Sequence, residues 1–125
     1  MIRILAACAL IGGCATAVPR DPLIVRTSCD VEVSFGSYAM GVDQELKARV
    51  LEVVSGNADV AGSVETPWGR EGESTLCIMA DDAVATDRLY DRIVDLLPRD
   101  SERAPTTVTH ADGRSRAVGM PPERQ

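Results

Sequence analysis

The sequence predicts one small domain of mixed α+β structure. The chain has 125 residues, which leaves room for a single domain. Hydrophobic residues make up 45% of it and charged residues 26%, a balance typical of a protein with a packed core. Apolar residues recur with the two-residue period of strands in some segments and with the helical period in others. The two periods alternate along residues 29–113, where we place the domain.

The first half of the domain begins with a clear strand pattern. Apolar and polar side chains alternate over residues 29–35, which predicts a strand with one buried face. Residues 42–55 carry apolar side chains at helical spacing and are followed by Gly56, a common end to a helix. Residues 59–66 alternate more weakly and predict a second strand.

The second half of the domain repeats this succession. Residues 74–80 are a run of β-prone side chains and predict a third strand. Asp81 and Asp82 precede an apolar helical pattern and favour a helix start, because negative charge is stabilised at a helix N-terminus. Pro98 ends that helix, and residues 106–110 predict the last strand.

The resulting order, β-α-β-β-α-β, resembles that of ferredoxin-like folds. The resemblance implies four antiparallel strands in the order 4-1-3-2, with both helices on one face of the sheet. After the last strand we expect a turn at Asp112 and Gly113 and then a disordered tail over residues 114–125.

The N-terminus has the pattern of an export signal. Residues 4–11 are all apolar, but as a helix this run is too short to cross a bilayer. Such a run after a short charged segment is typical of a secretory signal peptide. Residues 11–14, with the sequence Ile-Gly-Gly-Cys, resemble the lipobox of bacterial lipoproteins.

The lipobox resemblance implies a membrane anchor and concerns the signal segment alone. It implies that residues 1–13 are removed, that Cys14 is lipidated, and that residues 14–28 tether the domain to a membrane. Ala15 is not the aspartate that retains many lipoproteins in the inner membrane, which implies the outer membrane with the domain facing the periplasm. The alternative is cleavage after Ala17, which would release a soluble periplasmic or secreted protein.

The cysteines predict a disulfide within the domain. Of the four, Cys8 lies in the signal and Cys14 in the lipobox, which leaves Cys29 and Cys77. An even pair in an exported protein favours a disulfide, and the expected sheet places the two on neighbouring antiparallel strands. Free thiols or a catalytic role are the alternatives, although the wide separation does not fit a redox C-x-x-C motif.

That pairing has a consequence for Leu76 and Ile78. If Cys77 shares the core face with Cys29, alternation turns Leu76 and Ile78 toward the sheet face that no helix covers. One interpretation is a local register shift or a bulge. The other is an apolar surface used for dimerisation or partner docking.

The composition and motifs disfavour several functions. A net charge of -6 argues against nucleic-acid binding, which needs a basic face. His110 with Asp112 is the only acid–base pair with a histidine, and we expect an exposed histidine near a turn. A hydrolase using His110 or a free Cys29 or Cys77 is the remaining catalytic hypothesis. We expect no enzyme activity, no cofactor and no metal site.

The sequence favours an interaction surface over a catalytic site. Trp68 and Arg70 lie in a turn-rich segment, and both residue types are enriched in interface hot spots. The alternative for Trp68 is that its ring folds back and covers the edge of the sheet. We predict a non-enzymatic interaction or structural module that contacts an unknown envelope protein, or a second copy, through Trp68, Arg70, Leu76 and Ile78. The alternative is a soluble inhibitor or chaperone-like module, similar in element order to subtilisin-type propeptides.

Overall fold

The computed structural model describes residues 29–119. The expected signal peptide, the lipidation site Cys14 and the tether lie outside this range. The elements in chain order are β1 (Val31–Phe35), α1 (Gln44–Ser55), β2 (Val60–Pro67), β3 (Ser74–Ala80), α2 (Ala83–Val94), β4 (Thr106–His110) and β5 (Ser115–Val118). The α+β class predicted from the sequence is confirmed.

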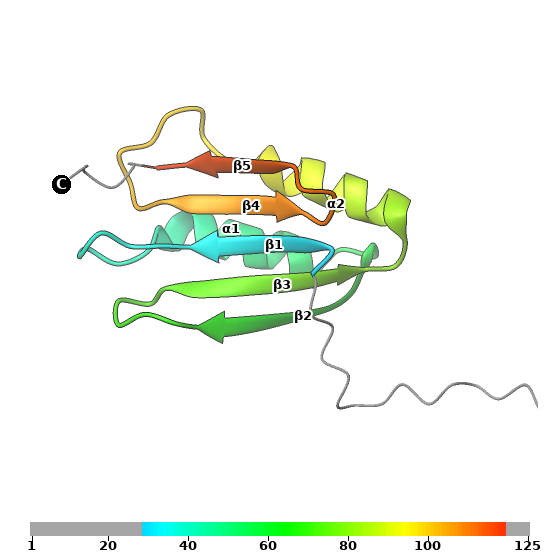
Figure 1. Cartoon of the computed structure of the whole chain (residues 1–125), viewed down its shortest axis with the longest axis horizontal. Coiled ribbons are helices and arrows are strands. Elements are labelled where there is room, and N and C mark those ends of the chain that lie inside the picture. The colour runs from blue at the N-terminus through cyan, green and yellow to red at the C-terminus, as the bar shows by residue number, and fades with distance from the viewer. Residues whose placement is uncertain (1–28, 120–125) are drawn as a thin grey trace, which may run out of the picture.

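The strands form one antiparallel sheet in the order β2-β3-β1-β4-β5, and both helices lie behind it in Figure 1. The expected strands follow one another in the expected order, but the sheet has a fifth strand. The prediction of a tail from residue 114 onward is therefore wrong for Ser115–Val118, which pairs with β4. Gly113, at φ 98°, allows the tight turn before it, and Val118 is buried against the core.

The core lies between the sheet and the two helices. Burial alternates along β1, β3 and β4, so that one face of the sheet is apolar and covered. α1 adds Leu46, Val50 and Val54 to this layer, and α2 adds Leu89 and Ile93. Their helical spacing is the pattern that predicted these helices, and burial of these side chains holds the helices on the sheet.

Aspartates fix the start of both helices. The side chain of Asp43 accepts a hydrogen bond from the Leu46 N–H at 3.1 Å, and that of Asp82 accepts one from the Ala85 N–H at 2.7 Å. Each satisfies a backbone donor that has no partner inside its helix. The capping role expected at Asp82 is confirmed, whereas α2 ends at Val94, before Pro98.

The structure corrects the expected orientation of β3. Val31 lies opposite Ile78 and Val33 opposite Leu76, so these apolar side chains share the helix-covered face. Leu76 is 2% exposed and Ile78 is 0% exposed. The interpretation as a docking surface is wrong for both residues, because they belong to the core. The interpretation as a register shift or bulge is also wrong, because β1 and β3 pair without interruption from Val31 to Phe35.

The reason for the error is the position of Cys29. Cys29 precedes the first residue of β1 and is not bound by the alternation of that strand. Cys29 forms a disulfide with Cys77, and the Cα atoms of the two residues are 5.2 Å apart. The side chain of Cys77 points away from the helices. The predicted disulfide is confirmed, and it lies on the uncovered face of the sheet.

One ion pair joins α1 to the edge of the sheet. Lys47 Nζ lies 2.6 Å from Glu65 Oε1, and the Ser74 hydroxyl donates to the same carboxylate oxygen at 2.8 Å. The hydrogen bond from Lys47, aided by that from Ser74, lowers the pKa of Glu65 below its usual value of 4.5.

This ion pair predicts an acid-dependent loss of stability. Because the pKa of Glu65 is lower in the folded state, its contribution is present above pH 4.5 and is lost as pH falls through the folded pKa. Replacing Lys47 by methionine is expected to raise the pKa of Glu65 toward 4.5, as measured by NMR titration of its carboxyl carbon. Arg49→Met is the control, because Arg49 pairs with Glu45 instead. An unchanged Glu65 pKa in the Lys47 variant would contradict the assignment.

Candidate functional site: the open face of the sheet

One side of the sheet is covered by neither of the two described helices, which both lie on its other side. We call it the open face and define it by the strand positions that share a side with Cys77, since residues directly opposite one another point the same way. These positions are Glu32 and Ser34 of β1, Gly62, Val64 and Thr66 of β2, Thr75, Cys77 and Met79 of β3, Thr107 and Thr109 of β4, and Ser115 and Ala117 of β5.

The strand registers arrange these side chains in two rows that cross all of the strands. The first row is Thr66, Thr75, Ser34, Thr107 and Ala117. The second row is Val64, Cys77, Glu32, Thr109 and Ser115. Most of these side chains are short, and six of the ten in the two rows carry a hydroxyl group. Such side chains have few rotamers to lose, so fixing them against a partner costs little entropy.

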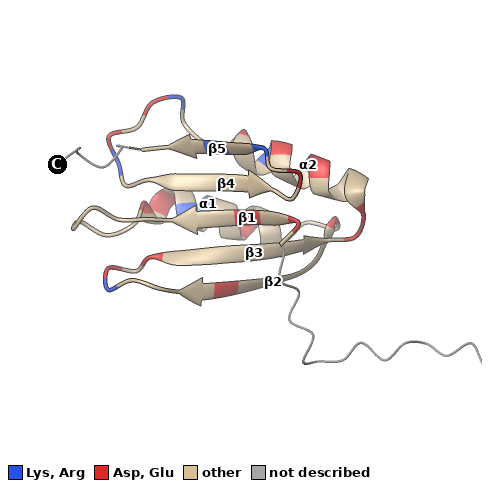
Figure 2. Cartoon of the chain, viewed as in Figure 1, with Lys and Arg blue, Asp and Glu red and all other residues tan. Residues whose placement is uncertain are grey.

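The open face carries almost no charge, although the chain is strongly acidic. Glu32 is the single charged side chain among the strand positions that define it. Figure 2 shows the strands largely tan and the acidic residues concentrated on α2 and the connecting loops. Burying a charge requires stripping it of water at a high cost in free energy, so an uncharged face is far easier to cover.

Trp68 lies beside the first row, two residues beyond Thr66. Its indole N–H donates to the Thr75 hydroxyl at 3.1 Å, which holds the ring at the open face, and the residue is 57% exposed. Val64, in the second row, is 58% exposed. An exposed tryptophan held by a hydrogen bond can contact a partner without losing much side-chain freedom.

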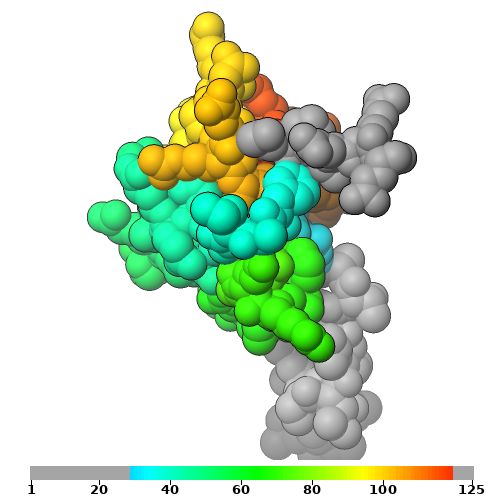
Figure 3. All heavy atoms as spheres, turned by 90° about the vertical axis from the view of Figure 1, so that its left-hand side faces the viewer, coloured from blue at the N-terminus to red at the C-terminus, as the bar shows by residue number. Residues whose placement is uncertain are grey.

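The hairpin that carries Trp68 is braced against the body of the domain. Figure 3 looks onto the end of the molecule where the β2–β3 hairpin (green) lies beside the loop after β1 (cyan). The Ser37 hydroxyl donates to the Glu71 carboxylate across this contact, and the Trp68 N–H donates to the Glu73 carbonyl at 3.1 Å. Arg70 is exposed at the tip of this hairpin. Of the four residues expected to form a contact surface, Trp68 and Arg70 are thus exposed, whereas Leu76 and Ile78 are in the core.

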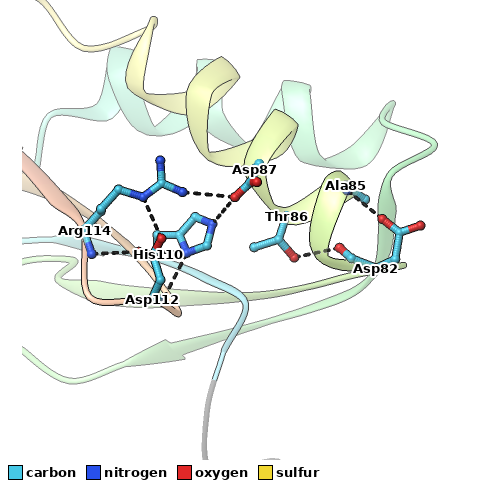
Figure 4. A network of polar contacts seen from close by, with 7 residues as sticks. All are labelled: Asp82, Ala85, Thr86, Asp87, His110, Asp112 and Arg114. Carbon is cyan, nitrogen blue, oxygen red and sulfur yellow. Dashed lines mark hydrogen bonds and ion pairs between the residues drawn. The ribbon is translucent and has the colours of Figure 1, made fainter.

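His110 is buried, contrary to the expectation of an exposed histidine. It is 8% exposed, and its ring meets the ring of Tyr90 edge-on at 5.3 Å between centroids. Figure 4 shows it between Asp87 of α2 and the turn that follows β4. Its Nδ1 accepts from the Asp112 N–H at 3.0 Å, which places the proton of the neutral ring on Nε2, 2.7 Å from Asp87 Oδ1.

The charged groups around His110 are hydrogen-bonded to one another. Arg114 donates to Asp112 at 2.7 Å and to Asp87 at 3.0 Å. The hydrogen bonds that Arg114 makes through its backbone N–H and its guanidinium lower the pKa of Asp112. Both ring nitrogens of His110 therefore have partners that tie α2 to the β4–β5 turn. The arrangement supports a structural role for this histidine.

A shallow hollow of about 520 Å³ lies beside this network and is rich in carboxylates. Asp30 accepts from the Ala80 N–H at 2.8 Å, and Asp82 caps α2, so these two oxygens already have donors. Within residues 29–119, no three His, Cys, Asp or Glu side chains are grouped as a metal ion would require. Neither described helix has the length and apolar character needed to cross a membrane.

Known proteins give no further lead. Comparison with family models, with curated proteins and with solved structures finds no match. The open face must therefore be interpreted from its own residues. The sequence shows part of this pattern, because Thr107 and Thr109 alternate with buried Val108 in β4. The rows themselves depend on the registers between strands, which the sequence does not display.

Proposed function

We propose that this protein is a non-enzymatic interaction module whose open face, with Trp68 at its end, binds the surface of another protein. The observation that carries the proposal is the contrast between an acidic chain and an uncovered sheet face with a single charged strand position. The chemistry of this face favours a partner surface that is itself uncharged, because a charged partner would lose hydration without finding an opposite charge.

We further propose that the module is lipid-anchored. The support is the resemblance of residues 11–14 to a lipobox and the presence of the Cys29–Cys77 disulfide, since such bonds form in oxidising compartments such as the periplasm. Acylation of Cys14 would hold the domain at the outer membrane.

The order β2-β3-β1-β4 also supports a ferredoxin-like core to which β5 adds an edge strand.

The intact mass of protein extracted from the membranes of its native host tests the anchor. A mass that begins at Cys14 and includes acyl chains supports the proposal. An unmodified mass that begins at Val18 contradicts it and makes the protein diffusible.

The contact surface is tested by two substitutions on the open face and one on the helix layer. Trp68→Ala removes the exposed ring, and Thr107→Lys places a charge within the first row. Val84→Ala is the matched control, because Val84 is 61% exposed on the opposite layer. We expect both open-face variants to reduce in-cell crosslinking to the same partner at least about tenfold, while the control leaves it unchanged. Identical crosslinking in all of the variants would show that the open face is not the contact surface.

The alternative is an inhibitor or chaperone-like module that uses the same face. The favouring observation is that an uncovered antiparallel sheet face can lie flat against an enzyme, as the similarity in element order to subtilisin-type propeptides implies. Titration of the purified protein against serine proteases of the envelope tests it. The absence of inhibition at micromolar concentration would remove this alternative.

A further inference from the structure

The outer edge of β2 is the longest unpaired strand edge in the described domain. β2 spans eight residues at one edge of the sheet, whereas β5 spans four at the other. Every residue of β2 from Ser63 to Pro67 is exposed. An edge of this kind presents backbone donors and acceptors to any strand that can pair with them.

The hairpin geometry shows which backbone groups point outward. The Trp68 N–H donates to the Glu73 carbonyl, so Trp68 and Glu73 form a hydrogen-bonded pair. Because such pairs alternate along antiparallel strands, Thr66 and Val64 also direct their N–H and C=O groups toward β3. Ser63 and Glu65 therefore direct theirs outward. Pro67 occupies an outward position too, where its missing N–H costs β3 no hydrogen bond.

The charge at this edge is already compensated. Glu65 is the charged residue of β2, and its carboxylate pairs with Lys47 at 2.6 Å on the helix side of the sheet. A lone edge carboxylate would repel an identical strand, but this one is part of an ion pair. The edge is therefore open to a strand of its own kind.

We propose that β2 pairs with β2 of a second copy of this chain, antiparallel, about a two-fold axis that passes between the two Val64 residues. In this register Ser63 lies opposite Glu65 of the second copy, and the two residues exchange hydrogen bonds on each side of the axis. The Val64 side chains meet directly on the open face, which buries two residues that are each 58% exposed in the single chain. The two sheets become one continuous sheet.

The irregular positions of β2 favour this register over its neighbours. The strand has a break in register between Val60 and Gly62. With Val64 on the axis, Pro67 lies opposite Ala61 of the second copy. Pro67 has no backbone N–H to donate, and Ala61 lies at the break in register, so this position loses no regular hydrogen bond. A shift of the axis to Glu65 would set the two carboxylates directly opposite each other. A shift to Ser63 would place Glu65 against the irregular Ala61.

The same features limit the assembly to two copies. Pro67 and the break near Ala61 restrict pairing to the short segment between them, and a two-fold pair uses the edge of both copies. The inference uses the backbone groups at the edge of β2, whereas the proposed function uses the side chains of the open face. Val64 belongs to both surfaces, and the pairing of β2 edges does not depend on the proposed function.

Sedimentation equilibrium of the full-length chain in detergent tests the dimer. Ser63→Pro removes an outward N–H that β3 does not use, and with it two hydrogen bonds per dimer. We expect it to weaken association about tenfold or more. Ala117→Pro is the matched control. The His110 N–H donates to the Arg114 carbonyl, so by the same alternation the Ala117 N–H points outward at the β5 edge.

Single cysteines test the register. In a non-hydrogen-bonded pair the two Cα atoms are about 4.5 Å apart, so Val64→Cys is expected to form a disulfide between copies under mild oxidation. Thr66→Cys is the control, because its two copies would be about 14 Å apart along the strands. A chain that stays monomeric, a dimer that Ser63→Pro does not weaken, or equal crosslinking at the two cysteines would overturn the proposal. If dimerisation fails while crosslinking to the open-face partner persists, only this inference fails.

Discussion

Replacing Cys29 and Cys77 together by alanine is expected to lower the free energy of unfolding by about 4 kcal/mol. The bond joins residues separated by 48 positions, so it removes much of the freedom of the unfolded chain. In the folded state it ties Cys29, two residues before β1, to Cys77 in the middle of β3. A domain of this size is expected to have a total stability of only about 5–15 kcal/mol, so the loss is large.

Urea unfolding of the oxidised protein and of the double variant measures this loss. Both cysteines are replaced, since a single substitution would leave a free thiol. Thr109→Ala is the control, because Thr109 lies in the same row of the open face as Cys77 but forms no cross-link to another residue. We expect this control to change stability by less than about 0.5 kcal/mol. A double variant as stable as the oxidised protein would show that the bond adds nothing to this fold.

The positions of the main elements were predictable because their patterns are set by burial. β3 and β4 coincide with the ranges expected from the sequence, residues 74–80 and 106–110. The range of β3 followed from its run of β-prone side chains, which fit the half-buried surface of a sheet. The start of α2 was predictable from Asp82, since an aspartate ahead of an apolar helical pattern satisfies free backbone donors.

β5 was missed because an edge strand needs few buried side chains. Of its residues, only Val118 is buried, so alternation has almost nothing to act on. Gly113 was recognised as a turn residue, but a turn alone does not show whether the chain returns along the sheet. The strand exists because β4 offers it an unpaired edge, which is a property of the assembled sheet.

The open face was only partly predictable, for a related reason. The sequence indicated an uncovered sheet face and an exposed Trp68. It assigned Leu76 and Ile78 to that face because it counted Cys29 as a strand residue. The strand begins at Val31, two residues later than expected, so the side to which Cys29 points does not follow the alternation of β1. As a result, every residue of β3 lies on the side of the sheet opposite to the one expected. Where a strand begins depends on hydrogen bonds to its neighbours, such as the Asp30 N–H to the Ile78 carbonyl at 3.1 Å.

Ile78→Ala is expected to lower the free energy of unfolding by about 3 kcal/mol, within the range of 2–5 kcal/mol for such core substitutions. Ile78 is 0% exposed and lies opposite Val31 in the layer that the helices cover. Its removal leaves a cavity that a close-packed core cannot fully close. Urea unfolding measures the change, with Met79→Ala as the control, because Met79 is adjacent in the chain but lies on the open face.

The two substitutions decide between the orientations of β3. If Ile78 faced outward, as the sequence pattern suggested, Met79→Ala would be the more damaging change. The structure predicts the reverse, because only Ile78 is packed on all sides.

The charged substitution Leu76→Asp sharpens the comparison. On an outward face it would leave the fold intact and alter only binding. Leu76 is 2% exposed, so it is instead expected to unfold the domain by placing an unpaired carboxylate in the core.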